Sequence, residues 1–129
     1  MMNVMKNLTW TSLTIQRAEG LKQSLEALAR LNLAYLKEHP ECPKLFESDV
    51  AYAPDIRSEC YSTVPGLLAS GRASVCEIVA WRVAELTLEG RPATVRITWD
   101  RNVLTPSVRH QDGTLEQPAL IVSKKGQGQ

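Results

Sequence analysis

The chain is short of the residues from which several common protein classes are built. Of its 129 residues only 5% are aromatic and three are cysteines, and no two cysteines form a CxxC pair. Cysteines this far apart encode no local zinc knuckle. Their odd number argues against a secreted disulfide scaffold and favours reduced thiols. We therefore expect the protein to be made and folded in a cytoplasm.

An excess of one charge and a long apolar run are also missing. Lys plus Arg number 15 and Asp plus Glu number 14, which gives a formal net charge of +1. A balance this even offers no electrostatic argument for nucleic acid or an anionic membrane as a partner. No stretch of about 20 apolar residues could span a membrane, and the N-terminus lacks the apolar run of a signal peptide. Glycine-rich phosphate loops and EF-hand loops are absent, so the sequence predicts no cofactor and no metal.

What is present is the composition of one globular domain, with 43% hydrophobic and 22% charged residues. A chain of this length can bury a single core. We predict an N-terminal arm over residues 1–16, one domain over 17–123 and a flexible, glycine-rich tail over 124–129. The arm holds Thr and Ile with poor alternation, which suggests extended structure or an edge strand.

Apolar spacing predicts two long helices. Leucines recur at intervals of three and four from 18 to 38, which is typical of an amphipathic helix, and a His-Pro pair ends it. A second helix is predicted over 73–89. Ser74 is its expected N-cap, Glu77 completes a capping box, and Gly90 is the expected residue just past its end.

Shorter elements are expected around these helices. The segment 41–65 carries three prolines and apolar anchors, so we expect an ordered connection that wraps the core. A short helix over 64–69 should stop at Gly71. The pattern after the second long helix predicts three strands, over residues 93–99, 105–110 and 114–120. An Asp-Gly pair between the last two strands is typical of a hairpin turn.

Two pairs of side chains on these elements have ordinary structural interpretations. We expect Trp81 and Trp99 to lie in the core or to be half-buried, because no basic stripe accompanies them. We expect Arg82 and Glu85 to form a weak pair on the surface of the second long helix.

Cys76 is the residue that the pattern singles out for chemistry. It falls in the first turn of the predicted 73–89 helix, where free backbone N–H groups and the helix dipole stabilise a thiolate and lower its pKa. A cysteine nucleophile also needs a base and a group that orients the base. We expect His39 to cap helix carbonyls and His110, beside the turn, to be solvated. The alternative for Cys76 is an inert, buried thiol.

Three strings in the region 38–122 carry a family resemblance: HPECPKLFESDVAY, ECYSTVPGLLASGRASVCEIVAWRVAELTLEGRPA and VRHQDGTLEQPA. In order and spacing this region resembles small transglutaminase-like proteins found among bacteriophage and prophage structural genes. The resemblance implies an α+β fold with a papain-like core, in which a helix carries the nucleophilic Cys at its N-terminus. That helix would pack on a small antiparallel sheet that carries a His and then an Asp.

The resemblance also assigns roles to individual positions. Cys76 matches the family's nucleophile, and Glu77 matches the acidic residue after it. Thr105, however, stands at the position of the catalytic His, and Gln117 stands at that of the orienting Asp. Threonine has no group that titrates near neutral pH, and a neutral amide cannot stabilise an imidazolium as a carboxylate does. The resemblance therefore implies a vestigial nucleophile without its base.

His110 is the residue that could restore a base. It stands five residues after Thr105 on the same predicted strand. Because strand side chains alternate between faces, this odd offset is expected to point His110 away from Cys76. A bulge at Pro106 would shift the register and restore the facing.

These observations leave three hypotheses. The first is a non-enzymatic virion structural protein, made in the bacterial host cytoplasm, that docks on other phage structural proteins at the neck, tail or baseplate. It would be present in several copies of a symmetric assembly, and the apolar arm would either dock on a partner or cover a sheet edge. The second is an active cysteine hydrolase or transferase, a peptidase or amidase, with Cys76 as nucleophile and His110 as base. The third is redox pairing among Cys42, Cys60 and Cys76.

Overall fold

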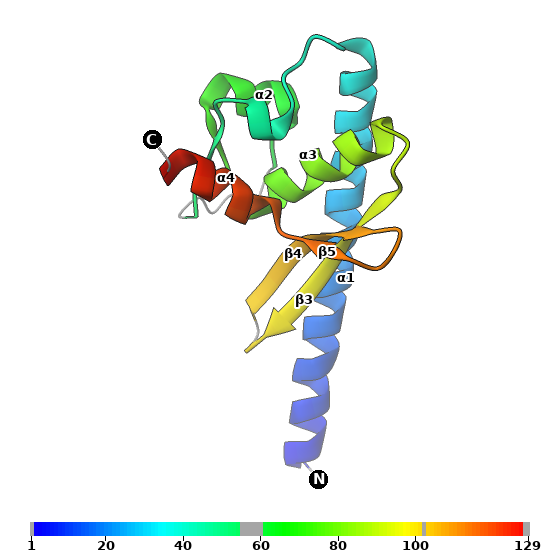
Figure 1. The fold of residues 1–129 in the computed structure, drawn as a ribbon. Coiled ribbons are helices and arrows are strands. Elements are labelled where there is room, and N and C mark those ends of the chain that lie inside the picture. The colour runs from blue at the N-terminus through cyan, green and yellow to red at the C-terminus, as the bar shows by residue number, and fades with distance from the viewer. Residues whose placement is uncertain (1, 55–60, 102, 128–129) are drawn as a thin grey trace.

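The computed structural model describes residues 2–54, 61–101 and 103–127, and their side chains from 15 to 123. The chain is α+β (Figure 1). Its elements in order are α1 (Met2–Glu38), the 3-10 turn η1 (Leu45–Glu47), β1 (Ala51–Tyr52), α2 (Val64–Ser70), β2 (Arg72–Ala73), α3 (Val75–Leu88), β3 (Ala93–Asp100), β4 (Val103–His110), β5 (Leu115–Glu116) and α4 (Pro118–Gln127).

Two small sheets are present among the described residues. The antiparallel sheet has the strand order β3-β4-β5, and its register pairs Ala93 with His110 and Asp100 with Val103. The other sheet is a parallel pair of two-residue strands, β1 and β2. Figure 1 shows the antiparallel sheet lying across the middle of α1, while α2 and α4 lie near the N-terminal end of α3, away from α1. The predicted arrangement of a Cys-bearing helix on a small antiparallel sheet, with an N-terminal helix, is confirmed at this level.

The helix α3 is the centre of the molecule, because apolar clusters form on two of its sides. The first cluster packs α3 and α1 against the sheet, and its most buried members include Leu25, Val79, Leu86, Val95 and Val108. The second cluster packs α3 against the 41–54 segment, α2 and α4, and its most buried members include Leu45, Val64, Leu67, Ile78 and Trp81. The prediction that the proline-rich connection packs on the core is confirmed for its described part, and residues 55–60 of it lie outside the described residues. Trp99, near the β3–β4 turn, is 51% exposed.

The predicted ends of α2 and α3 are confirmed by the backbone. Ser74 caps α3 by accepting a hydrogen bond from the Glu77 N–H, and the Glu77 carboxylate accepts one from the Ser74 N–H. Gly90 follows α3 with φ of 78°, and Gly71 ends α2 with φ of 74°. Both angles lie in the left-handed region that glycine adopts without a steric penalty.

The prediction of an extended arm over residues 1–16 is wrong. Residues 2–16 form the first turns of α1, which runs unbroken to Glu38. The Thr and Ile residues that suggested extended structure have only a small intrinsic penalty in a helix. Continuation of an already formed helix adds one hydrogen bond per residue and needs no new nucleus, so this penalty is overcome.

The C-terminal prediction is also corrected. The strand expected over 114–120 is reduced to the two residues of β5, and α4 begins at Pro118. Proline is favoured in the first turn of a helix, where its missing N–H costs nothing. Residues 124–127, predicted as tail, are the last residues of α4.

Candidate functional site

The thiol of Cys76 lies one residue inside the N-terminus of α3, as the sequence predicts. It is partly buried and packs beside the cluster formed by α1, α3 and the antiparallel sheet. The Tyr61 hydroxyl forms a hydrogen bond with it. In the described part of the chain this tyrosine is the hydrogen-bond partner of the thiol.

The prediction of a lowered pKa for Cys76 is wrong. Burial raises the pKa of the Cys76 thiol and outweighs the lowering by the hydrogen bond from Tyr61, and the Glu77 carboxylate adds a further, smaller increase. Burial, together with the bond to Cys76, raises the pKa of Tyr61 to about 12. Both groups are therefore neutral near pH 7.

The reason is that the Glu77 carboxylate, and not the Cys76 thiol, occupies the N-terminus of α3. The Glu77 side chain is 6% exposed and its two oxygens accept hydrogen bonds from the backbone N–H groups of Ser74 and Ser62, at 2.9 and 2.7 Å. Glu77 is thus a buried group held at the positive end of α3. A thiolate at Cys76 would lie beside this carboxylate and be repelled by it. This repulsion offsets the stabilisation that the positive end of the helix would otherwise give the thiolate.

Thr105, at the position that the resemblance gives to the catalytic His, lies on the sheet face that points away from α3. The buried side chains of Val95 and Val108 are paired across β3 and β4 on the face toward the helices. Thr105 is three residues before Val108, so it points to the opposite face, and it is exposed. The register of β3 and β4 continues through Pro106 without a bulge.

His110 shares the face of Val108, which points toward the helices, whereas Thr105 points to the other face. The odd offset between Thr105 and His110 therefore holds, but it is Thr105 that points outward. His110 is not solvated, contrary to the prediction. Its Nε2 donates to Glu116 Oε1 at 3.1 Å, and only 18% of its side chain is exposed. Through Glu116, which also accepts a hydrogen bond from Arg82, His110 is linked to the middle of α3. Arg82 is six residues, or about 9 Å of helix, from Cys76.

Gln117, at the position of the family's orienting Asp, serves the backbone. Its Nε2 donates to the carbonyl oxygen of Pro106 at 2.8 Å. This bond ties the start of α4 to β4 beyond the short pairing with β5. His39 is likewise engaged: its Nδ1 donates to the Tyr35 carbonyl at 2.9 Å, and its ring stacks on that of Tyr35. The prediction that His39 caps a helix carbonyl is confirmed.

A chain of charged side chains joins His110 to the interior. Arg82 Nε donates to Glu116 Oε2 at 2.7 Å, and Arg82 Nη1 lies 3.5 Å from Glu85 Oε1. Glu85 Oε2 accepts the Leu45 N–H at 2.6 Å. Burial raises the pKa of Glu85, against the lowering by the Leu45 N–H and Arg82. The Arg82–Glu85 pair is therefore buried, not a surface pair as predicted.

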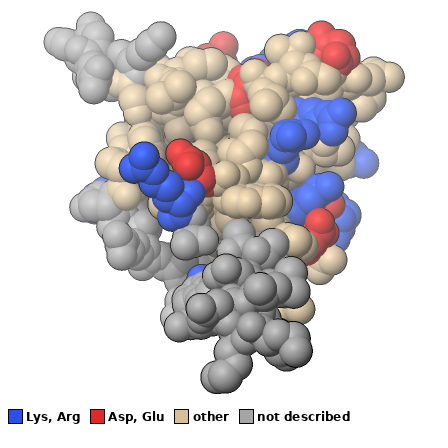
Figure 2. Space-filling view, turned by 90° about the horizontal axis from the view of Figure 1, so that it is seen from below, with Lys and Arg blue, Asp and Glu red and all other residues tan. Residues whose placement is uncertain are grey.

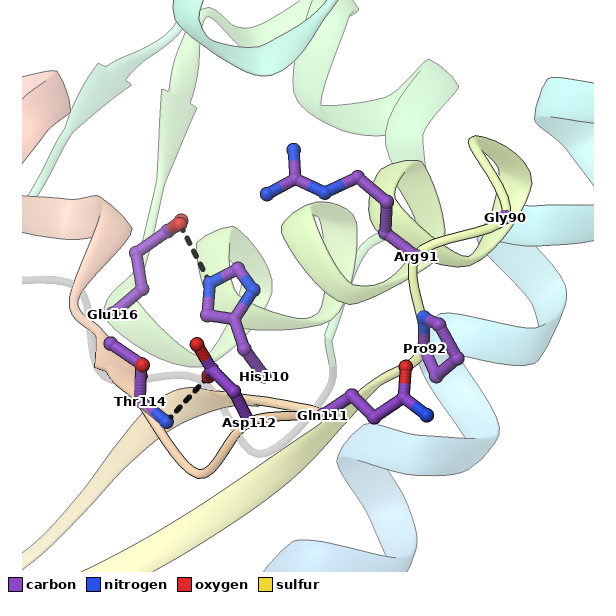
Figure 3. Close-up of a pocket in the computed structure, with 8 residues that line it drawn as sticks. All are labelled: Gly90, Arg91, Pro92, His110, Gln111, Asp112, Thr114 and Glu116. Atoms are coloured by element: carbon purple, nitrogen blue, oxygen red, sulfur yellow. Dashed lines mark hydrogen bonds and ion pairs between the residues drawn. The ribbon is translucent and has the colours of Figure 1, made fainter.

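An open hollow of about 590 Å³ lies beside His110 (Figure 3). Two turns form its walls, one between α3 and β3 and one between β4 and β5. Its lining residues are Gly90, Arg91, Pro92, His110, Gln111, Asp112, Thr114 and Glu116. Glu116 was missed by the sequence reasoning. Its position opposite Val108 could have been found from the strand alternation, once β5 was known to pair with β4.

The cysteines show no pairing in the part of the chain that the structure describes. Cys42 and Cys76 are both free thiols. Burial and the Glu85 carboxylate raise the pKa of Cys42. Cys60, the third cysteine of the redox hypothesis, lies outside the described residues.

The described residues contain neither a metal-binding cluster nor a membrane-spanning helix. No group of three or more His, Cys, Asp and Glu side chains there could hold a metal ion. No helix in that part of the chain has the length and apolar character needed to cross a bilayer. On the face seen in Figure 2, acidic and basic side chains lie interspersed among uncharged ones.

Comparison with known proteins gives no significant match to a family model, a curated protein or a solved structure. The transglutaminase-like resemblance therefore stays a prediction. The α+β arrangement stands on the structure itself.

Proposed function

We propose that this chain is a non-catalytic protein of papain-like, transglutaminase-like fold that docks on other structural proteins of a phage particle. The observation that carries the proposal is the set of groups around the Cys76 thiol. The thiol is hydrogen-bonded to Tyr61, lies beside the Glu77 carboxylate, and has no imidazole as a partner among the described residues.

Acyl transfer by a cysteine needs a thiolate and a group that returns a proton to the leaving group. His110 donates to Glu116, and His39 donates to the Tyr35 carbonyl. The residues at the family's His and Asp positions do not contact the thiol. Thr105 is exposed on the sheet face that points away from α3, and Gln117 donates a hydrogen bond to the Pro106 carbonyl. A fold that keeps its shape but, among the described residues, places no base beside the cysteine is suited to binding.

Two further features support docking in an assembly. The N-terminal turns of α1 project past the antiparallel sheet (Figure 1), which offers a helix to a partner. The resemblance to proteins of phage structural genes suggests that the partners are other virion proteins at the neck, tail or baseplate. Repeated copies in a symmetric ring would follow from such a place.

The second candidate is a cysteine hydrolase or transferase with Cys76 and His110. One observation favours it: His110 faces α3 and has a carboxylate partner, Glu116, which is how catalytic histidines are oriented. It requires the imidazole to leave Glu116 and to reach the sulfur.

Alkylation of Cys76 across pH separates the two functions. In a C42S/C60S background, iodoacetamide reports the thiolate fraction of Cys76 alone. A pKa raised by burial and by Glu77 leaves the thiol unreactive at neutral pH, so the rate should rise only with a midpoint above the ordinary value of 9.0. His110→Ala should leave this profile unchanged.

A profile with its midpoint below about pH 7, shifted upward by His110→Ala, would overturn the non-catalytic proposal and establish a thiolate–imidazolium pair. Burst release of product from an activated ester or amide, abolished by Cys76→Ser, would do the same.

A further inference from the structure

The strand β3 leaves one long edge of the antiparallel sheet without a partner strand. It is the outermost strand in the order β3-β4-β5, and its eight residues pair with β4 without a bulge. Among the described residues, the backbone of β3 forms backbone hydrogen bonds only with β4. Figure 1 shows β3 crossing α1, with no strand along its other side.

The hydrogen-bonding groups at this edge belong to alternate residues of β3. Asp100 and Val103 are paired across a two-residue turn, so they form the hydrogen-bonded pair that closes the hairpin. Because bonded and non-bonded pairs alternate along an antiparallel ladder, the backbone N–H and C=O groups of Val95, Ile97 and Trp99 point to the outer edge. A row of such groups is a template for another strand.

The features that usually protect an edge strand are missing from the eight described residues of β3. Its sequence, ATVRITWD, has no proline and no lysine, and its face toward the helices carries Val95, Ile97 and Trp99 without a charge. Trp99 shares this face with the buried Val95, yet it is 51% exposed. The end of the edge therefore presents an apolar ring that its own chain leaves half uncovered.

The two charges of β3 indicate a second copy of the same strand as the partner. In a symmetric pair of antiparallel strands, each residue lies opposite a residue of the same face. With Thr98 at the two-fold axis, Arg96 of each copy lies opposite Asp100 of the other, and Ile97 then lies opposite Trp99. Centring the pair on Arg96 would place two guanidinium groups together. Centring it on Ile97 or Trp99 would leave Asp100 opposite a threonine.

Both charged side chains are available for this contact. Arg96 and Asp100 are exposed, and neither forms an ion pair within the described part of the chain. Opposite charges that face each other across neighbouring strands stabilise the pairing, and a two-fold axis provides the contact twice. The sequence of β3 is therefore complementary to itself in one register.

We propose that two copies of this chain pair through β3, antiparallel about Thr98, and so join two three-stranded sheets into one. The pairing gives partners to the outward N–H and C=O groups, sets two Arg96–Asp100 ion pairs on one face and covers both Trp99 rings on the other. It goes beyond the proposed function, because it requires neither a phage protein nor the Cys76 thiol.

A disulfide at the two-fold axis tests the register. In a chain whose three cysteines are replaced by serine, Thr98→Cys brings two thiols to a non-hydrogen-bonded pair, where the Cα atoms lie about 4.5 Å apart. This separation is within the range that a disulfide spans. Oxidised glutathione should therefore convert most of this variant into a covalent dimer on a non-reducing gel, and a reductant should reverse it.

Thr94→Cys in the same background is the matched control. Thr94 is exposed on the same face of β3 as Thr98, but it lies four residues from the axis. The two copies of this residue would be about 26 Å apart at 3.3 Å per residue, so this variant should stay uncross-linked.

Charge reversal tests the Arg96–Asp100 contacts in the full chain. Sedimentation velocity from about 10 µM to about 1 mM protein should show a monomer–dimer equilibrium. Asp100→Arg sets like charges opposite each other twice and should weaken the dimer about tenfold. The double variant Arg96→Asp/Asp100→Arg restores opposite charges and should return the dissociation constant to within about threefold of its original value. Asp49→Arg makes the same charge change at an exposed site of the 41–54 segment and should have less than about a twofold effect.

Three results would overturn the proposal. The first is a chain that stays monomeric over the whole concentration range. The second is equal cross-linking of the Thr98→Cys and Thr94→Cys variants, which would show that the contact is not centred on Thr98. The third is a double charge variant that dimerises as weakly as Asp100→Arg alone, because the two charges would then not face each other.

Discussion

At the scale of single residues, the position next to a cysteine decides whether a helix N-terminus can activate it. Glu77 occupies the third helical position, accepts two backbone N–H bonds and lies next to Cys76. A helix N-terminus acts as roughly half a positive charge, and its effect falls off within the first turn. With the Glu77 carboxylate at this helix end, the Cys76 thiol is left with burial and a hydroxyl partner, and burial raises its pKa.

Substitutions at its two neighbours should move the pKa of Cys76 in opposite directions. Glu77→Gln removes a nearby negative charge and keeps an acceptor for the Ser74 N–H, so the alkylation midpoint in the C42S/C60S background should fall. Tyr61→Phe removes the hydrogen bond that favours the thiolate, so the midpoint should rise.

Tyr52→Phe is the control, because it deletes a hydroxyl from β1 and should leave the midpoint unchanged. A midpoint that rises in Glu77→Gln would contradict this account of Cys76.

At the scale of elements, the charged chain around Arg82 joins α3 to two segments that are distant in sequence. Glu116 of β5 and Glu85, which holds the Leu45 N–H of η1, both meet the same guanidinium. The Arg82 guanidinium also lies 4.8 Å from the centre of the Phe46 ring. The short strand β5 and the turn η1 thus depend on one side chain of α3.

Removal of this guanidinium should be costly. Arg82→Met keeps an apolar stem but leaves two carboxylates without their cationic partner, so the free energy of unfolding should fall by about 3 kcal/mol. Urea denaturation monitored by circular dichroism measures the change.

Arg96→Met, on the exposed side of β3, should change the same quantity by less than about 0.5 kcal/mol. A loss below about 1 kcal/mol in Arg82→Met would show that the carboxylates are solvated when the arginine is absent.

At the scale of the whole molecule, α1 is longer than the body that packs against it. Its 37 residues span about 55 Å at 1.5 Å per residue. Among the side chains that the structure describes, which start at Ile15, the first deeply buried one in α1 is Ala18. Figure 1 shows the earlier turns of the helix beyond the sheet. The docking role proposed above would fall on these earlier turns.

Deletion of residues 2–14 should separate these two roles. We expect the free energy of unfolding of the truncated chain to stay within about 0.5 kcal/mol of the full chain. We also expect mass spectrometry of purified phage particles to detect the full chain and not the truncated one. Equal incorporation of both chains would contradict docking through α1, and loss of the folded state would show that these turns complete the core.

Local patterns predicted much of the fold and less of the site. The caps of α3, the left-handed glycines and the two long strands depend on interactions within a few residues, so the sequence could indicate them. The ends of the chain were mispredicted because weak β propensity competed with continuation of α1, and because Pro118 opens a helix where a strand was expected.

By itself, the sequence determined that a cysteine stands in the first turn of a capped helix and that the strand after it alternates faces. Only the tertiary structure decided what those residues do. It set Glu77 and Tyr61 around the thiol, turned Thr105 outward and placed His110 on Glu116. The reason is physical: a pKa or a hydrogen bond depends on burial and on charges brought together from distant parts of the chain, and no local pattern encodes either.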